Sequence, residues 1–221
     1  MLYLLLIGCN ENFIWEQPKQ PGNDSGLEED TEDPPEESIP PAAETIYLNT
    51  SGSLFYWIDS GYIEIGQFTL PDGQQPNITD IAINSEGVIL GVSTNSLYQI
   101  HPQNAELSLL STIDEPLFGL AFDHQDTLYA TGEGLYILTP ETGSLIEISL
   151  NGDLESTSDL VIFPNGELYC FSRSFDAILG DILIKIEPNT GNYEEIGYTW
   201  IEGITGAASA YDYLVAATDS G

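Results

Sequence analysis

Oxygen-bearing side chains recur at one kind of turn in this sequence, and such oxygens are the ligands that Ca²⁺ prefers. The turns read Asn84-Ser85-Glu86-Gly87, Asp123-His124-Gln125-Asp126 and Pro164-Asn165-Gly166. Asp123 and Asp126 are the candidate metal ligands, because one turn supplies both carboxylates. A calcium loop needs roughly six to eight oxygens, and tight turns also require Asp, Asn and Gly for conformational reasons. The sequence therefore favours a structural role for these turns and leaves Ca²⁺ open as a cofactor.

A second candidate site is the stretch from Ser172 to Asp181, which is longer than the corresponding turns of about four residues elsewhere. It holds the only arginine of the chain, Arg173, close to Phe175 and Asp176. Loops longer than their counterparts often carry function, so we expect these three side chains to contact a ligand or a partner. The alternative is that Arg173 pairs with a nearby carboxylate and the apolar residues cover the end of a sheet.

Other residue types that support catalysis are sparse. Cys170 lies inside an expected strand, where a cysteine is usually a small buried hydrophobic residue. His101 and His124 fall in different kinds of turn, which does not make a metal-binding pair. The sequence contains no nucleophile elbow, no His-Glu-x-x-His motif and no Gly-rich phosphate loop. An enzyme is therefore the less favoured class.

The segment Leu6-Ile7-Gly8-Cys9 resembles a bacterial lipobox. That resemblance implies cleavage before Cys9 and attachment of a lipid to it. Residues 1–9 carry no basic residue, and their apolar run is short for a signal peptide, so we interpret them as a signal remnant whose start was assigned too late or whose gene was clipped. The alternative is an apolar N-terminus without a signal function. A transmembrane helix is excluded, since it needs roughly 18 apolar residues. Asn10, rather than Asp, follows the cysteine, which leaves the outer membrane or the cell surface as the location.

Residues 10–44 differ in composition from the rest of the chain. They are acidic, rich in proline and poor in large apolar side chains. Such a segment cannot bury enough apolar surface to offset the entropy of ordering, so it is predicted to be a disordered linker. Residues 45–221 are then the folded domain.

The charge of the chain excludes two classes of partner. The formal net charge is −33, with Lys19, Arg173 and Lys185 as the only basic residues. A polyanion of this strength repels nucleic acid and anionic lipid surfaces. Membrane contact is therefore expected only through the lipid on Cys9, and the remaining partners are proteins or glycans of the cell envelope.

A unit of four short strands is repeated along the folded domain. In residues 119–150, four apolar runs are separated by turns too short to hold a helix. The second run of each unit centres on Ile89, Leu128, Leu168 and Leu214, at steps of 39, 40 and 46 residues. A four-stranded repeat near 40 residues is typical of β-propeller blades. A β-sandwich is the alternative, but sandwiches lack such regular turn chemistry.

The segment from Leu135 to Gly143 reads Leu-Tyr-x-Ile-x-Pro-x-Thr-Gly and returns in variant form at 183–191. It resembles the blades of quinoprotein-type and YVTN/NHL-like propellers, and the resemblance covers residues 46–221. It implies an all-β fold, a propeller-like array of four-stranded antiparallel blades. Because these motifs mark strands and turns, they indicate little about activity.

About four to five blades are expected, with an incomplete ring. Residues 45–70 match strands two, three and four of the repeat, whereas residues 206–217 match strands one and two. The last strand therefore duplicates a strand that is already present and does not supply the missing first one. We interpret the sequence as three full blades flanked by two partial ones, truncated at its C-terminus.

Two functions remain open. The first is a binding or scaffold module, anchored in the cell envelope, that presents one propeller face to a protein or glycan. The second is a propeller enzyme, either a Ca²⁺-dependent hydrolase or lactonase or a quinoprotein-like dehydrogenase. The expected first strands are almost wholly apolar, which disfavours a metal or quinone site in the channel. Connections between blades, such as 72–80 or 151–159, could still supply carboxylates there, so an enzyme is not excluded.

Overall fold

The structure is a computed structural model that describes residues 5–8, 46–58, 61–148, 157–172, 180–201, 203–210 and 213–218. All regular elements in these ranges are β-strands, and they form five sheets whose neighbouring strands are antiparallel. No helix in the described part of the chain is long and apolar enough to cross a membrane.

Three of the sheets have four strands in chain order. One contains β5 (Asp80–Ile83), β6 (Ile89–Ser93), β7 (Ser96–Ile100) and β8 (Leu107–Thr112). The next contains β9 (Gly119–Phe122), β10 (Leu128–Thr131), β11 (Leu135–Thr139) and β12 (Ser144–Ile148). The third contains β13 (Thr157–Ile162), β14 (Leu168–Ser172), β15 (Ile182–Glu187) and β16 (Asn192–Tyr198).

Two further sheets have three strands each. One joins β2 (Tyr47–Asn49), β3 (Ser53–Ile58) and β4 (Gly61–Gln67). In the other, β18 (Tyr213–Thr218) lies between β17 (Ile204–Ala210) and β1 (Leu5–Gly8). The expected three full and two partial repeats are therefore present, and β18 does not join the sheet of β2.

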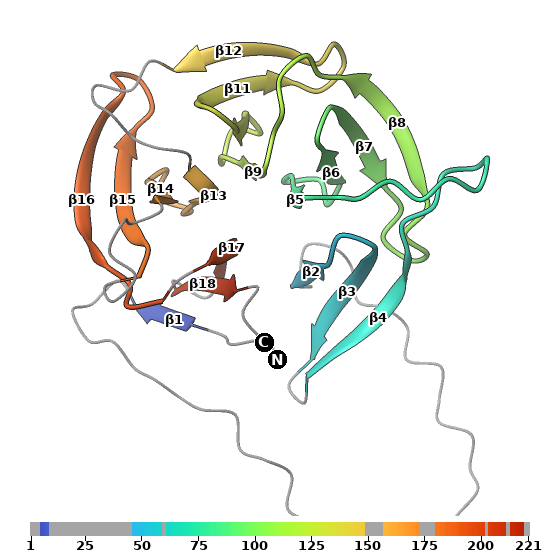
Figure 1. The fold of residues 1–221 in the computed structure, drawn as a ribbon, viewed down its shortest axis with the longest axis horizontal. Coiled ribbons are helices and arrows are strands. Elements are labelled where there is room, and N and C mark those ends of the chain that lie inside the picture. The colour runs from blue at the N-terminus through green and yellow to red at the C-terminus, as the bar shows by residue number, and fades with distance from the viewer. Residues whose placement is uncertain are drawn as a thin grey trace, which may run out of the picture.

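The sheets are arranged in a ring, with β5, β9, β13 and β17 towards its centre and β8, β12 and β16 on its periphery (Figure 1). Each inner strand packs against the inner strand of the next sheet, from β5 through β9 and β13 to β17. This is the β-propeller that the repeat predicted. Single meanders of four strands leave a face uncovered, and stacking around the ring covers it.

The second strand of each repeat supplies a buried side chain at the predicted centre. Ile89, Leu128, Leu168 and Leu214 are all buried. The peripheral strands β12 and β16 instead alternate between exposed and partly exposed positions. Inner strands are covered on both faces by neighbouring sheets, whereas a peripheral strand borders solvent, so the two kinds of strand differ in their apolar pattern.

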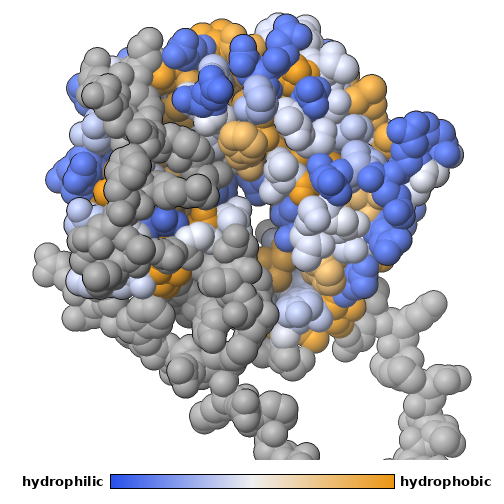
Figure 2. Space-filling model, in the orientation of Figure 1, coloured by the Kyte–Doolittle hydropathy of each residue, from blue (hydrophilic) through white to orange (hydrophobic). Residues whose placement is uncertain are grey.

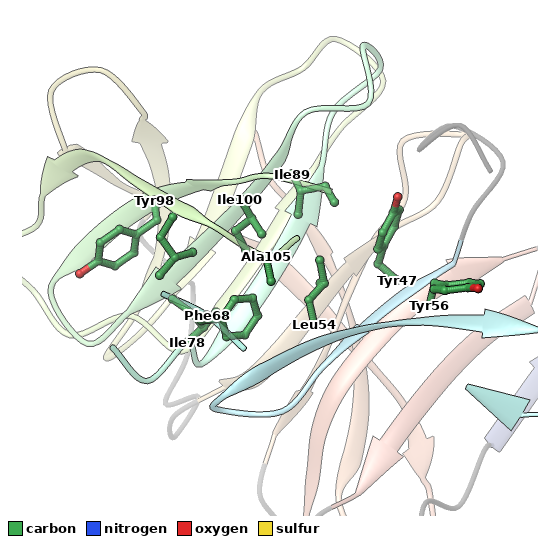
Figure 3. Packing of buried hydrophobic residues seen from close by; sticks show 10 residues of the cluster. Tyr47, Leu54, Tyr56, Phe68, Ile78, Ile89, Tyr98, Ile100 and Ala105 are labelled. Carbon is green, nitrogen blue, oxygen red and sulfur yellow. The ribbon is translucent and has the colours of Figure 1, made fainter. Parts of the chain in front are cut away.

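The core lies between the sheets. Between the sheet of β2, β3 and β4 and the sheet that begins with β5, Tyr47 and Leu54 pack with Ile89 and Ile100 (Figure 3). Full burial of such a side chain contributes about 1.5–3 kcal/mol. The connection from β4 to β5 adds Phe68 and Ile78 to this cluster, and the turn between β7 and β8 adds Ala105. Apolar residues outside the strands therefore help to hold neighbouring sheets together.

Residues 5–8 pair with the C-terminal strand of the described chain. In β1, Leu5 lies opposite Ala216 and Gly8 lies opposite Tyr213. This strand takes the position that the third strand has in the four-stranded sheets. Three residues of the expected lipobox, 6–8, therefore belong to a strand, whereas Cys9 and the predicted linker 10–44 lie outside the described residues.

Candidate functional site

The site residues predicted from sequence fall into two groups. Cys9, Arg173, Phe175 and Asp176 lie outside the described residues, so their predicted roles stay predictions. Asp123 and its neighbours are described, and they form the turn between β9 and β10.

The Asp123 carboxylate organises its own turn. Its Oδ1 accepts hydrogen bonds from the backbone N–H of Gln125 and of Thr127, both at 2.8 Å. In the neighbouring repeat Asn84 accepts in the same way, from the N–H groups two and four residues further along. Side chains of this kind mimic a backbone turn, so the conformational role expected for Asp123 is present.

The Asp126 carboxylate joins two sheets. It accepts hydrogen bonds from the backbone N–H of Ser85 at 2.8 Å and from the Ser85 hydroxyl at 2.6 Å. These bonds hold the pKa of Asp126 below its ordinary value. The backbone φ angle of Asp126 is 60°. At the same turn position the neighbouring repeats have glycine, with φ of 79° at Gly87 and 84° at Gly166. An Asp tolerates this conformation better than most residues, and here its side chain contacts the adjacent repeat.

No group of three or more His, Cys, Asp or Glu side chains in the described ranges is arranged to hold a metal ion. The two histidines remain in separate turns: His101 accepts weakly from the Gln103 N–H, and His124 lies beside Gln125. Cys170 is fully buried in β14, as expected, and burial raises the pKa of its thiol far above the ordinary value.

Two carboxylates that sequence reasoning did not select lie at the inner strands. Asp80 is the first residue of β5, and Asp159 lies in β13 at a register shift between Thr157 and Leu160. Their exposed fractions are 7% and 0%. Each is the last residue of a connection that was named as able to supply carboxylates near the channel.

Each of these carboxylates bonds to the inner strand of the next sheet. Asp80 Oδ2 accepts from the Leu120 N–H of β9 at 2.6 Å. Asp159 Oδ2 accepts from the Ala207 N–H of β17, and its Oδ1 accepts from the Leu160 N–H at 2.7 Å. Each carboxylate therefore accepts a hydrogen bond from a backbone amide of the neighbouring sheet. These bonds connect β5 to β9 and β13 to β17.

The inner strands alternate between Asp and Gly at one register. The position is defined by the residue that lies opposite in the second strand: Val92 for Asp80, Thr131 for Gly119 and Ala217 for Gly206. In β13 the pairing is interrupted here, and Asp159 directly precedes Leu160, which lies opposite Cys170. Each Asp bonds to the N–H of the residue that follows the Gly of the next sheet. The absence of a side chain at the Gly leaves room for the carboxylate that crosses it.

Gly119 shows how tight this arrangement is. A Cβ atom at Gly119 would lie 2.5 Å from Thr131 Oγ1, 2.9 Å from Asp159 Oδ1 and 3.1 Å from Asp159 Cα. Asp80 and Asp159 also hydrogen-bond to each other. The two carboxyl groups, from alternate sheets, therefore meet beside the inner strand of the sheet between them. We call Asp80 and Asp159 the carboxyl pair.

Burial dominates the protonation of the carboxyl pair. It raises the pKa of Asp80 to about 7, against the opposing effect of the Leu120 and Ile81 amides. Burial, and then the charge of Asp80, raises the pKa of Asp159 well above its ordinary value. Two carboxyl groups in one desolvated site cannot both ionise freely, so the pair retains a proton near neutral pH.

A proton-sharing carboxyl pair could in principle transfer protons to a substrate. Here both groups are buried and accept hydrogen bonds from backbone amides. A general acid or base must come within hydrogen-bond reach of its substrate, and this position gives a substrate no access. The chemistry that fits is the binding of a proton or of a small ion inside the ring.

Two large aromatic side chains are exposed on connections that lead into inner strands. Phe118 directly precedes β9 and is 41% exposed, and Trp200 lies between β16 and β17 and is 65% exposed. Figure 2 shows an opening near the ring centre, and the described part of the face around it carries hydrophilic side chains with separate apolar areas. Because each repeat runs in the same sense, connections into inner strands lie on the same face of a propeller as the first residues of those strands.

The Trp200 loop is braced by the residues that end the long stretch 172–181. The Asp181 N–H donates to the Ile201 carbonyl at 2.7 Å, and the Thr199 N–H donates to the Asp181 carbonyl at 2.8 Å. The Asp181 carboxylate accepts from the Ile204 N–H at 2.9 Å. A Cβ at Gly180 would lie 2.1 Å from the Ile201 nitrogen, so the two segments are in close contact. Trp200 itself has φ of 61°.

The sequence matches no known protein family and no curated protein. Solved structures are similar in fold. A Bacteroides thetaiotaomicron protein of unknown function has a TM-score of 0.55 at 11% identity over 79% of this chain and 56% of its own. Hydrazine synthase of Kuenenia stuttgartiensis has a TM-score of 0.50 at 12% identity, over 76% and 49%.

A catalytically inactive variant of virginiamycin B lyase from Staphylococcus aureus, solved with quinupristin, gives a TM-score of 0.50 at 13% identity, over 79% of this chain and 62% of the lyase. The chain therefore spans about half to three fifths of these structures. They include proteins with different activities, and likeness at this level of identity shows the fold alone. The chain is thus a β-propeller domain, similar in fold to these structures.

Proposed function

We propose that the chain is a binding module that presents the face around Trp200 to a glycan or protein of the cell envelope. The observation that carries the proposal is an exposed tryptophan on a braced loop. Its positive φ costs on the order of 1–3 kcal/mol, and an exposed indole gains nothing from burial in the core. Such a residue persists where the surrounding structure holds it, and a ligand would recover the lost burial.

Aromatic side chains suit this role for two physical reasons. Their flat faces bury a large apolar area at small entropic cost, and the indole N–H provides a polar contact. Tryptophan is also enriched among the residues that dominate binding energy at interfaces. The bracing of Thr199 and Ile201 by Asp181 orders the loop before a ligand arrives, which lowers the entropic cost of binding.

The charge of the chain limits the ligand. With a net charge of −33, an acidic ligand would be repelled, whereas a neutral glycan or a basic protein surface would not. Among the described residues, Lys185 is bound to Glu167 and lies 5.8 Å from the centre of the Tyr169 ring. That lysine is therefore engaged within its own sheet, and the proposed contact relies on aromatic side chains rather than on cations.

An enzyme of the hydrolase, lactonase or dehydrogenase kind receives less support. Such enzymes need charged ligands that converge on an accessible channel. The described carboxylates at the inner strands, Asp80 and Asp159, are buried and bonded to backbone amides. They hold sheets together at the place where an enzyme would use ligands.

Replacement of Trp200 by alanine tests the proposal. Wild-type protein and the Trp200→Ala variant would be applied to an array of cell-envelope glycans and, by surface plasmon resonance, to basic envelope proteins. We expect a glycan or protein ligand whose affinity falls at least about tenfold in the variant, as for a central aromatic contact. Ile146→Ala is the matched control, because Ile146 is 61% exposed on the peripheral strand β12 and is expected to leave binding unchanged. Equal binding by wild type and Trp200→Ala would contradict the proposal.

Anchoring through Cys9 is the second part of the proposal, and it excludes the pairing of β1 with β18. Cleavage before Cys9 removes residues 1–8, whereas that pairing requires residues 5–8. Intact-mass measurement of protein extracted from bacterial membranes is expected to show a lipidated species that begins at Cys9. The Cys9→Ala variant should stay soluble. A membrane-extracted chain that retains residues 1–8 without lipid would refute anchoring and leave binding through Trp200 unaffected.

A further inference from the structure

We infer that the carboxyl pair and Thr131 form an internal site for one hard cation of the Ca²⁺ class. The site would tie together β5, β9, β10 and β13 from three consecutive sheets. It is separate from the Asp123 and Asp126 turn and from the Trp200 loop. The inference does not depend on the proposed binding function.

The first observation is the Thr131 hydroxyl. Thr131 is the last residue of β10, its exposed fraction is 0%, and its Oγ1 has no hydrogen-bond partner among the described residues. Buried hydroxyl groups are nearly always hydrogen-bonded or bound to an ion or water. An unpartnered oxygen beside two carboxyl groups therefore indicates that something else completes its contacts.

The second observation is where that oxygen points. Thr131 Oγ1 and Asp159 Oδ1 lie 2.5 Å and 2.9 Å from the same point, the Cβ position that Gly119 leaves vacant. The Asp80 carboxyl is hydrogen-bonded to Asp159 and so belongs to the same cluster. Two carboxyl groups and one hydroxyl make a set of hard oxygen ligands, which is the kind that Ca²⁺ prefers.

The third observation concerns positive charge among the described residues. Lys185 is the one lysine or arginine that the structure describes, and it is bound to Glu167. A buried carboxylate is stable only when paired with a positive charge or when protonated. Within the described part of the chain, no lysine or arginine side chain is left to pair with Asp80 and Asp159, and a metal ion from solution would supply the charge.

The test is a thermal melt of the whole chain at pH 8, after EDTA treatment, with increasing CaCl₂ at constant ionic strength. We expect the melting temperature to rise with the logarithm of the Ca²⁺ concentration, as mass action requires for a ligand of the native state. Parallel melts with MgCl₂ and NaCl compare cation size and charge.

Variants separate this site from the acidic turns. Asp159→Asn and Thr131→Val should weaken the response to Ca²⁺ at least tenfold in apparent affinity, whereas Thr131→Ser should retain it. Asp126→Asn, a carboxylate removed from the surface turn, should respond like wild type. Thr131→Val keeps the shape of the side chain and removes an oxygen that has no partner, so it is expected to fold even if Asp159→Asn does not. No rise in wild type, or an equal rise in Thr131→Val, would overturn the inference.

Discussion

Raising the pH from 4 to 8 in the absence of divalent cations is expected to lower the free energy of unfolding. The pKa of Asp80 is about 7 in the folded chain against an ordinary 3.8, and that of Asp159 is raised as well. A raised folded pKa means that the native state binds more protons than the unfolded state. Its stabilising contribution is therefore complete below pH 4 and is lost as pH rises through about 7.

The expected loss is on the order of a few kcal/mol, because each pKa unit corresponds to about 1.4 kcal/mol. For a chain of this length that is a fall in melting temperature of roughly 5–15 °C. Repulsion among the acidic surface groups acts in the same direction, so melts should be repeated at about 0.5 M NaCl, where exposed charges are screened. The contribution of the buried pair should persist in salt.

Asp80→Asn is the matched control for this prediction. The amide can still accept a hydrogen bond from the Leu120 N–H and can donate one to Asp159, yet it does not titrate. We expect this variant to be less sensitive to pH than wild type and more stable than wild type at pH 8. Identical pH profiles in high salt would contradict a shared proton in the carboxyl pair.

Gly119→Ala is expected to destabilise the domain by about 2–4 kcal/mol, which combines overpacking with loss of buried hydrogen bonds. The new methyl group would collide with Thr131 Oγ1 and Asp159 Oδ1, and the Asp159 backbone prevents it from moving aside. Chemical denaturation would measure the change. Gly52→Ala is the control, since a Cβ atom there has nothing within 4 Å.

A double variant distinguishes the carboxyl pair from general crowding. Thr131→Ala removes the hydroxyl that the new methyl group would meet first, at 2.5 Å. In the background of Thr131→Ala, the cost of Gly119→Ala should therefore be smaller by about 1 kcal/mol or more, a coupling typical of residues in contact. Strict additivity of the two substitutions would show that the close approach around Gly119 is not what limits this position.

The fold was predictable because local signals repeat. Apolar runs separated by short polar turns return near every 40 residues, and Leu128, Leu168 and Leu214 occupy the second strands, as their spacing predicted. The structural role of Asp123 followed from turn chemistry alone. Its bonds to Gln125 and Thr127 require only the local chain, so no knowledge of the ring was needed.

The carboxyl pair could not be predicted in the same way. Asp80 and Asp159 are 79 residues apart in sequence, and they meet only because Gly119, in the sheet between them, lacks a side chain. A signal was nevertheless present. Aligning the repeats by their first strands places Asp, Gly, Asp and Gly at one position, an alternation that marks contacts between neighbouring sheets and not within them.

The exposure of Trp200 could not be predicted from the sequence, for a different reason. Sequence patterns identify strands and turns, but they do not show that a tryptophan between two strands stays exposed. Its exposure follows from the bracing of its loop by Asp181 and Gly180. These two residues end the long stretch from which Arg173 was selected, whereas Arg173 lies outside the described residues and its role stays a prediction.

The most direct test of the account is the titration of Asp80 and Asp159 by carboxyl ¹³C NMR, with signals assigned by comparison with Asp80→Asn and Asp159→Asn. The measurement would follow both signals from pH 3 to pH 9 in EDTA. The account predicts coupled titrations, with an apparent pKa near 7 for one proton and no separate titration near pH 4 for either group. Two independent transitions near pH 4 would show that the carboxyl groups are solvated and separate, and would contradict a shared site between the inner strands.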